Sequence, residues 1–457
     1  MRGGRESWAR VRVKTIGILF LVAFVFVVGR AFYLQIASGE NWDKQADKQY
    51  ARVVTLTPQR GTIFDRNGEP LAISVEVESV CVYPRKVKAT PEQTRQLAAL
   101  LEMDEKTVQA RLVSSKNFYW LKRQVAPAII EKIRLLEIPG IGFHREHQRF
   151  YPNSEIASHV VGFTGVDPRG LEGIELRYNV LLAGDERRLI SENDHKGRSL
   201  GQAAQQIEGD GPQGDLYLTI DKNLQYIAEK ELAAGVYSAR AKAGTVVVVA
   251  PETGEILAMA SLPDFNPNAA GSFRPETRRN RAVCDTFEPG STFKMFLMAA
   301  ALNEGVAIPG KRINCENGSY RVGGKTIHDH RRYGALTPTQ VLQVSSNIGS
   351  AKLGQGLGRE RYYRYLKAFG FGDRTGIDLP GEVNGLLSSP SKWFEIDLAA
   401  ISFGQGVSVT PIQLAMATAA IANGGILMKP QIVLKAQDRE GHLLEAGGGG
   451  GGGQVIP

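Results

Sequence analysis

The longest hydrophobic segment of the chain lies near its N-terminus. Apolar residues fill positions 16–29, and the apolar character resumes after Arg30 as far as Ile36. A helix over residues 16–36 would be about 31 Å long at ~1.5 Å per residue, which is enough to cross a bilayer. The pattern therefore predicts a membrane-spanning signal anchor. A cleaved signal peptide is the alternative, because Gly29-x-Ala31 permits a cut.

Beyond this segment, the pattern predicts strands and short amphipathic helices. Residues 51–56 alternate in polarity as a strand does. Helical periodicity predicts helices over 91–101 and 128–136. Residues 196–214 are polar and rich in glycine, which makes them the best candidate for a domain boundary.

The pattern after that boundary predicts a second domain. It opens with a strand over 216–220 and a helix over 224–235. Residues 245–250 are continuously apolar, which is typical of a strand buried on both faces. A turn at 251–254 leads into residues 255–260, so the two segments should form a hairpin.

Length and charge narrow the class of protein. The chain has 457 residues, which predicts two or three domains, and a formal net charge of +8. About half of that charge lies before residue 15, and no module of basic and aromatic residues follows, so a nucleic-acid partner is not expected. Positive residues before the apolar segment predict a cytoplasmic tail over 1–15 and an exported remainder.

The cysteines are too few for a disulfide framework and are expected to be small buried residues, with a Cys284–Cys315 pair left open.

The strongest candidate for chemistry is the Ser-x-x-Lys element formed by Ser291 and Lys294. Residues at i and i+3 share one face of a helix, and Lys294 is the only charge in an apolar run. Burial there should lower its pKa, so that a neutral lysine can take the proton of the serine hydroxyl. The backbone N–H of Ser291, at the start of the helix, could hold an oxyanion. On spacing alone, a capping serine and a lysine that reaches the surface are the more common arrangement.

A second element favours a catalytic role for Ser291 and Lys294 over the structural one. Ser345 and Asn347 form a Ser-x-Asn between apolar residues. The hydroxyl of Ser345 could relay a proton to a leaving amine, and the carboxamide of Asn347 could orient the substrate and the lysine. A helix cap or a turn is the alternative for this element.

With both motifs in this order, the chain resembles a class B penicillin-binding protein, a monofunctional peptidoglycan D,D-transpeptidase of the cell-division (FtsI) type. The resemblance covers roughly residues 16 to 435. Further segments that resemble the family are Arg60–Gly68, Arg149–Pro152, Gly170–Glu175, Ala258–Asn268 and Phe403–Gly406 followed by Thr410-Pro411.

The resemblance implies a multidomain α+β fold. A membrane helix over 16–36 would precede a mixed α/β pedestal, or dimerisation, domain over 37–205. A transpeptidase domain over 206–437 would carry a helix-flanked antiparallel sheet similar to that of serine β-lactamases, with Ser291 opening the central helix. Arg60 and Asp65 are candidates for an ion pair that ties the pedestal together.

The function implied by the resemblance is cross-linking of peptidoglycan stem peptides. Ser291, deprotonated by Lys294, would attack the penultimate residue of D-Ala-D-Ala, and Ser345 would relay a proton to the departing D-alanine. Asn347 would orient the substrate, and β-lactams would acylate Ser291. No metal or organic cofactor is implied. Location in the inner membrane, with division-complex proteins and a glycosyltransferase as partners, is implied as well.

One departure from the family is the missing third motif, Lys-Thr/Ser-Gly, expected after Phe403–Gly406. Lys325-Thr326-Ile327 and Arg374-Thr375-Gly376 do not fit its position. Residues 438–457 contain seven consecutive glycines, and we expect them to be a disordered tail of a chain truncated within the transpeptidase domain. Weak turnover would follow. A non-catalytic, membrane-anchored division scaffold is therefore the alternative function, and a serine β-lactamase or β-lactam sensor is a weaker one.

The stretch His328-Asp329-His330 leaves two interpretations open. Alternate residues on a strand point to one side, so the two imidazoles could bind a metal ion, although no third ligand is identifiable nearby. A polar loop near the cleft is the better interpretation.

Overall fold

The computed structural model describes residues 3–33, 51–56, 59–184, 187–192, 205–207, 213–438, 440–444 and 453–456. The chain divides into two compact units. The first contains residues 1–58 and 185–210, and the second contains residues 59–184 and 211–457.

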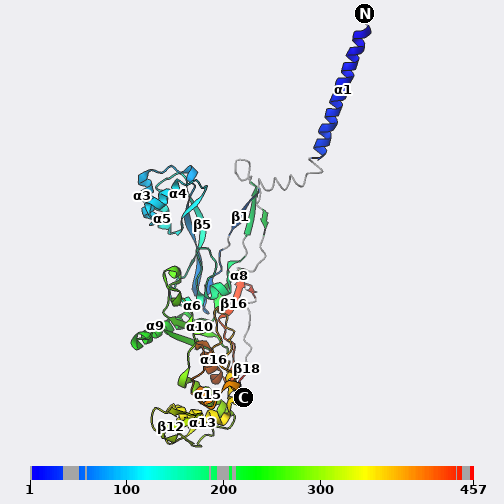
Figure 1. Ribbon diagram of the computed structural model, residues 1–457. Helices are drawn as coiled ribbons and strands as arrows, with labels where there is room; N and C mark the ends of the chain where they lie inside the picture. The colour runs from blue at the N-terminus through cyan, green and yellow to red at the C-terminus, as the bar shows by residue number, and fades with distance from the viewer. Residues whose placement is uncertain are drawn as a thin grey trace. The chain divides into compact units, whose positions relative to one another are not determined.

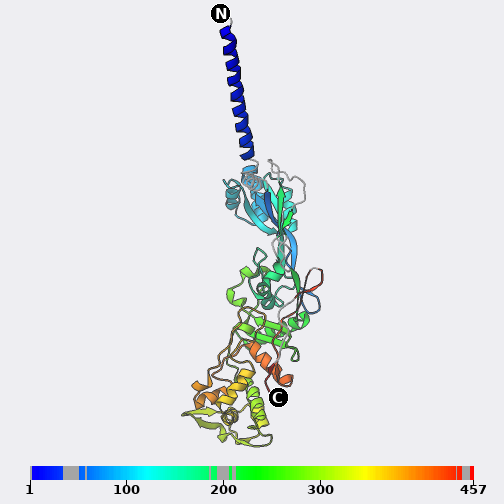
Figure 2. The same ribbon diagram turned by 90° about the vertical axis from the view of Figure 1, so that its right-hand side faces the viewer.

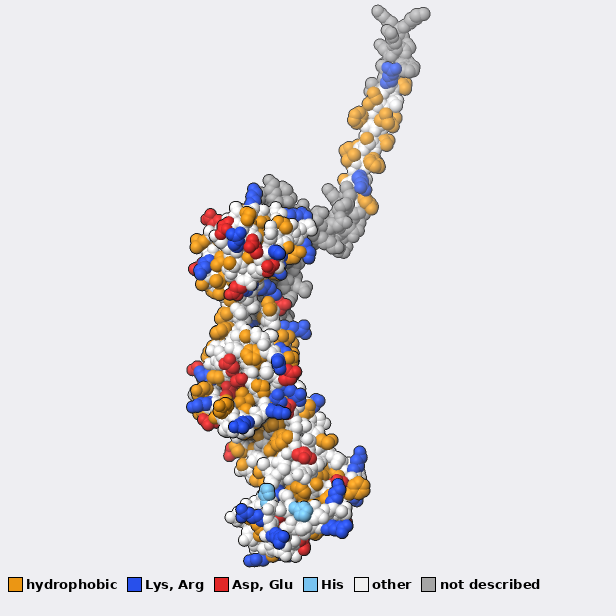
Figure 3. Space-filling model, turned by 60° about the vertical axis from the view of Figure 1, so that its left-hand side comes forward, with side chains coloured by type: hydrophobic (Ala, Val, Ile, Leu, Met, Phe, Trp, Pro, Cys, Tyr) orange, Lys and Arg blue, Asp and Glu red, His pale blue; other side chains and the backbone are white. Residues whose placement is uncertain are grey.

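The first unit holds the apolar helix and a small sheet. Helix α1 (Gly3–Phe32) contains one stretch, Lys14–Phe32, that is long and apolar enough to cross a membrane. From Val11 to Phe32, the large hydrophobic side chains that the structure describes on this helix are exposed (Figure 3). Strand β1 (Ala51–Leu56) pairs with β6 (Arg187–Glu192), which pairs with β7 (Gln205–Ile207), all antiparallel. The strand predicted over 51–56 is confirmed, whereas residues 34–36 of the predicted span lie outside the described residues.

The pedestal part of the second unit is built on a long strand, β3 (Pro70–Val82). It pairs with β5 (Ile141–Phe150) over ten residues, with β4 (Tyr119–Val125) and with β2 (Ile63–Phe64). Helices α3 (Pro91–Leu101), α4 (Glu105–Leu112) and α5 (Pro127–Arg134) gather at the far end of β3 and β5 (Figure 1). Their apolar faces share one buried cluster with β3. The helix predicted over 91–101 is confirmed, and the one predicted over 128–136 is shifted by one or two residues.

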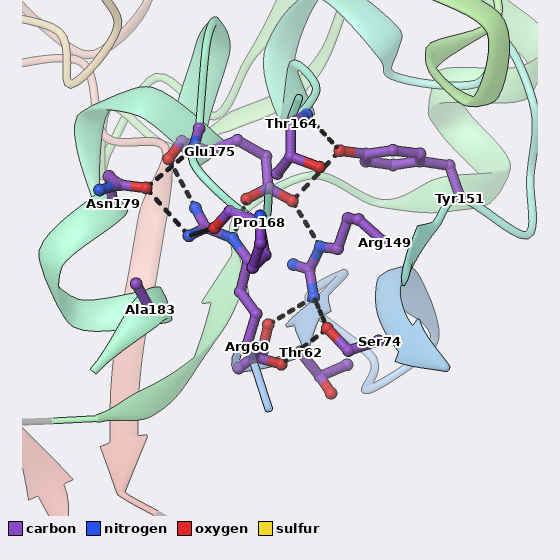
Figure 4. A network of polar contacts seen from close by, with 12 residues as sticks. Arg60, Thr62, Ser74, Arg149, Tyr151, Thr164, Pro168, Glu175, Asn179 and Ala183 are labelled. Carbon is purple, nitrogen blue, oxygen red and sulfur yellow. Dashed lines mark hydrogen bonds and ion pairs between the residues drawn. The ribbon is translucent and has the colours of Figure 1, made fainter. Parts of the chain in front are cut away.

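At its base, the pedestal is held by a buried network of charges (Figure 4). Glu175 accepts a hydrogen bond at 2.6 Å from the Nε of Arg60 and another at 2.6 Å from the Nε of Arg149. Tyr151 donates to the same carboxylate at 3.4 Å. The predicted Arg60–Asp65 pair is wrong, because the carboxylate of Asp65 instead accepts backbone N–H groups of its own turn and of Lys222, at the start of the next long helix.

The C-terminal part of the second unit begins with β8 (Gly214–Leu218), which joins the pedestal sheet between β2 and β16 (Val433–Asp438). Helix α9 (Lys222–Ala239) follows, and then the hairpin of β9 (Gly244–Val249) and β10 (Ile256–Leu262), which confirms the predicted hairpin. The expectation that residues 245–250 are buried on both faces is wrong, because every residue of β9 is partly exposed. Within the described residues, β10 is the only strand that pairs with β9, so the other edge of β9 has no strand partner there.

Most of the remaining helices gather in the yellow-to-orange part of the chain (Figure 2) and pack around α11 (Lys294–Asn303), which is apolar and mostly buried. They are α12 (Pro338–Gln343), α13 (Asn347–Leu357), α14 (Arg359–Ala368), α15 (Glu395–Ile401) and α16 (Pro411–Ala422). Short elements complete the unit: α6 (Ser158–Val161), α7 (Gly173–Arg177), α8 (Asn179–Ala183), α10 (Arg281–Cys284), β11 (Ile313–Asn314), β12 (Ser319–Val322), β13 (Lys325–His328), β14 (Ala335–Leu336) and β15 (Ile426–Leu427).

The tail expected to be disordered, residues 438–457, includes short strands where the structure describes it. They are β17 (Leu443–Leu444), paired with β16, and β18 (Gly453–Gln454), paired with β15. The last strand is held because Val455 is buried in the core around α11 and its N–H donates to Gly425 at 2.7 Å. Most of the glycine run lies outside the described residues.

Candidate active site

The candidate nucleophile, Ser291, lies on a short 3₁₀ turn (Gly290–Phe293) that leads directly into α11. The turn requires two glycines in contact. Gly290 has φ +56° and donates its N–H to the carbonyl of Gly404 at 2.9 Å. Gly404 has φ +79°, and a Cβ there would lie 2.1 Å from the carbonyl oxygen of Gly290. The Phe403–Gly406 stretch, read from the sequence only as a family resemblance, therefore supports the turn that presents the serine.

Lys294 lies one turn further along and is almost fully buried, with 1% of its surface exposed. Its neighbours on the helix, Phe293, Phe296 and Leu297, are all completely buried. Desolvation lowers the pKa of Lys294 to about 8, although the negative charge of Asp329 acts in the opposite direction. About a tenth of the lysine is then neutral at pH 7, far more than for an exposed lysine.

The amine of Lys294 has three hydrogen-bond acceptors. It donates to the carbonyl oxygen of Ser345 at 2.7 Å, to the Oγ of Ser345 at 2.9 Å and to the Oδ1 of Asn347 at 2.8 Å. The hydroxyl of Ser345 in turn donates to the Oγ of Ser291 at 2.8 Å. The structure thus brings all four predicted residues together in one hydrogen-bonded chain, from lysine through Ser345 to Ser291.

These hydrogen bonds indicate a different route for the proton from the one that the sequence suggested. The sequence suggested that Lys294 deprotonates Ser291 directly, but in the described part of the protein the recorded path between them runs through Ser345. A hydroxyl can donate and accept at once, so Ser345 can pass a proton in either direction. The arrangement can therefore generate an alkoxide on Ser291 and later return a proton to a leaving group.

Ser345 occupies an unusual backbone position. Its φ of +55° is in the left-handed region, which is unfavourable for a residue with a side chain and persists only where the surroundings fix it. Ser346 follows as the N-cap of α13, where its hydroxyl accepts the N–H of Gly349 at 2.9 Å. The expected helix cap at this element is thus present, but Ser346 supplies it, and the side chains of Ser345 and Asn347 are left to face Lys294.

The two sequences that resemble the third motif have other roles. Thr375 donates both its N–H and its hydroxyl to the carboxylate of Glu382, each at 2.6 Å, which closes a turn. Thr326 lies in β13, which pairs only with β12 among the described strands.

The described cysteines are all free, so the Cys284–Cys315 pair left open above is not formed. Cys81 and Cys315 are buried, as expected, whereas Cys284 is partly exposed.

Comparison with known protein families finds two matches. The profile of the penicillin-binding protein dimerisation domain matches residues 55–216, and that of the penicillin binding protein transpeptidase domain matches residues 244–445. Together these matches cover most of the chain outside the apolar helix.

Curated relatives are similar along most of their length. The chain is 35% identical over 423 residues to the probable peptidoglycan D,D-transpeptidase PenA of Neisseria meningitidis, a match that covers 91% of this chain and 72% of the relative. It is 36% identical over 415 residues to the peptidoglycan D,D-transpeptidase FtsI of Escherichia coli, a match that covers 89% of this chain and 70% of the relative. The stage V sporulation protein D of Bacillus subtilis is 35% identical over 94% of this chain and 68% of its own length.

Solved structures agree with these matches. A peptidoglycan synthetase from Bifidobacterium adolescentis has a TM-score of 0.68 at 28% identity and covers 89% of this chain and 79% of its own. Penicillin-binding protein 3 from Mycobacterium tuberculosis in complex with ampicillin has a TM-score of 0.66 at 26% identity, covering 88% and 72%. The names of these relatives favour the enzyme over the scaffold as the function of this chain.

Proposed function

The chain belongs to the penicillin-binding protein family, as a class B peptidoglycan D,D-transpeptidase, and we propose that it cross-links stem peptides through an acyl-enzyme on Ser291. The observation that carries this assignment is the hydrogen-bonded chain from Lys294 through Ser345 to Ser291. It joins a nucleophile, a relay and a base whose pKa is near neutrality, as acyl transfer requires.

In the acylation step, neutral Lys294 takes the hydroxyl proton of Ser345 while Ser345 takes that of Ser291. The Oγ of Ser291 forms a bond to the carbonyl carbon of the penultimate D-alanine. The bond to the terminal D-alanine then breaks, and its amine leaves with a proton returned through Ser345. Asn347 holds the lysine and orients the peptide.

In the second step, the amine of a neighbouring stem peptide attacks the ester carbonyl. Its proton passes back along the same residues, the new amide bond is the cross-link, and Ser291 is released as a hydroxyl. A β-lactam in place of the stem peptide would acylate Ser291 and stop at the ester.

Labelling with a fluorescent penicillin tests this proposal. The full chain in membranes should be labelled, and Ser291→Ala should lose the label while membrane insertion is unchanged. Ser238→Ala, which removes a hydroxyl on the exposed side of α9, is the matched control and should label normally. Undiminished labelling of Ser291→Ala would contradict the assignment of the nucleophile.

The location is proposed from the same family and the charge pattern. The apolar part of α1 anchors the chain in a membrane, and we place it in the inner membrane with the basic N-terminus in the cytoplasm and the enzyme in the periplasm. A reporter that is active only after export, fused after residue 40, should be active; cytoplasmic activity would reverse the orientation. Division-complex proteins and a glycosyltransferase are the proposed partners, which cross-linking of the full chain in dividing cells would identify or exclude.

A further inference from the structure

The loop after β13 places a carboxylate behind the Ser345–Asn347 element. One oxygen of Asp329 accepts the backbone N–H of Asn347 at 2.6 Å and that of Ile348 at 3.1 Å. The other accepts the hydroxyl of Ser346 at 2.7 Å. Asp329 thus binds three consecutive residues, and they are the three that directly follow Ser345.

These contacts complete the start of α13. The first N–H groups of a helix have no partner within it. Asp329 satisfies those of Asn347 and Ile348, and Ser346 satisfies that of Gly349 at 2.9 Å. A carboxylate at this end of a helix is also favoured by the helix dipole.

The loop that carries Asp329 is itself anchored to the same helix. Strand β13 ends at His328, and the N–H of Asp329 donates to the carbonyl of Gly318 at 3.2 Å. The hairpin of β12 and β13 buries Val322 and Ile327 in a cluster with Ile348 of α13. The core contact therefore packs the hairpin that carries Asp329 against α13.

The neighbouring carbonyl contributes a further contact. The amide nitrogen of Asn347 donates to the carbonyl of His328 at 3.1 Å, which leaves the Oδ1 turned to Lys294 at 2.8 Å. Residues 328 and 329 thus orient both the backbone and the side chain of Asn347.

From these contacts we infer that Asp329 is a positioning residue, which holds Ser345 in its left-handed conformation and sets the electrostatic field at Lys294. The inference rests on the proposed function, and it differs from the metal interpretation of the His328–His330 stretch. It assigns the carboxylate to backbone N–H groups and a hydroxyl, and those contacts use both of its oxygens.

Two substitutions separate the mechanical role from the electrostatic one. Asn keeps one side-chain oxygen for the N–H groups of Asn347 and Ile348, and its amide nitrogen can donate to the hydroxyl oxygen of Ser346, so Asp329→Asn should still hold α13 while removing the charge. Asp329→Ala removes both. Asp104→Asn is the matched control, since Asp104 caps α4 through the N–H and the hydroxyl of Thr107, far from Lys294 in sequence and in the pedestal.

The first readout is the rate of acylation by a penicillin as a function of pH. Asp329→Ala should acylate about 10²-fold more slowly, because a small displacement of a relay group has an effect of that size. Asp329→Asn should recover much of that loss, and the midpoint of its pH profile should fall below that of the parent chain, because the charge that raises the pKa of Lys294 is gone. Asp104→Asn should match the parent in both rate and midpoint.

The second readout needs no reaction. NMR of protein containing ¹³Cε-labelled lysine follows the titration of Lys294, with the Lys294→Met variant identifying its signal. Asp329→Asn should lower that pKa even if the chain forms no acyl-enzyme, so failure of this inference and failure of the proposed function can be told apart. An unchanged or raised pKa in Asp329→Asn, or parental acylation by a folded Asp329→Ala, would overturn the inference.

Discussion

Two sites in this protein bury cationic side chains, and the sites differ in the groups that contact those side chains. In the pedestal, Arg60 and Arg149 each contact the carboxylate of Glu175 at 2.6 Å. In the candidate active site, the three acceptors of Lys294 are all uncharged, and the nearby Asp329 instead accepts backbone N–H groups and the hydroxyl of Ser346.

The difference explains which site can react. A guanidinium in direct contact with a carboxylate keeps its charge, so the pedestal network can only hold segments together. An amine that is desolvated, with its nearest carboxylate engaged elsewhere, has a pKa of about 8 and can gain or lose a proton at neutral pH. A buried cationic side chain that contacts a carboxylate thus stays charged and stabilises the fold. A buried amine that contacts only neutral oxygens can lose its proton and act as a base.

Removing the amine of Lys294 should have the largest effect. Lys294→Met keeps the apolar stem of the side chain but has no amine to accept a proton. We expect acylation by a penicillin to fall by about 10²–10⁴-fold, the usual contribution of a general base. Lys86→Met, at an exposed lysine of the pedestal, is the control and should acylate at the parental rate. A comparable rate in Lys294→Met would mean that another group is the base.

Breaking the pedestal network should affect stability more than chemistry. Glu175→Gln leaves two buried guanidinium groups without a carboxylate, which should lower the free energy of unfolding by about 3–5 kcal/mol. Thermal melting measures this loss. Glu76→Gln removes the carboxylate of an ion pair with Arg145 in which both side chains are exposed, and it should cost less than about 1 kcal/mol. Equal losses in the two variants would show that burial of the network is not what makes it stabilising.

The smallest effect expected is that of pH on the parent chain. The neutral fraction of Lys294 rises as pH increases through a pKa of about 8, so acylation should accelerate by roughly tenfold between pH 7 and pH 9. Initial rates with a penicillin measured over this range give the profile. A flat profile, or a midpoint near the pKa of an exposed lysine, would show that Lys294 stays charged as the pedestal arginines do.

The sequence predicted local features better than distant ones. The strand at 51–56, the helix at 91–101 and the hairpin of β9 and β10 depend on short-range periodicity, and all three are present. Arg60 was paired with Asp65 because the two are close in the chain, whereas its partner Glu175 is 115 residues away. The burial of β9 was misjudged for a related reason, since an apolar strand is buried only if other elements cover both faces.

The candidate site shows the same division. Residue types and spacing were enough to select Ser291, Lys294, Ser345 and Asn347, because their chemistry is visible in the side chains. The contribution of Asp329 was missed, since its partners are mostly backbone N–H groups, which every sequence contains. The signal that could have found it is its place directly after a short predicted strand, ahead of a helix that begins with Ser346.

The three oxygens around Lys294 also fix the direction in which its lone pair must point. A neutral amine has two hydrogens to donate, so one of its three contacts has to be reversed. The carbonyl of Ser345 can only accept, and the Oδ1 of Asn347 is kept as an acceptor because its amide nitrogen is bound to His328. Only the hydroxyl of Ser345 can turn round and donate. Among these three contacts, the one with the Ser345 hydroxyl is therefore the contact through which the lysine can gain or lose a proton, and it leads to Ser291.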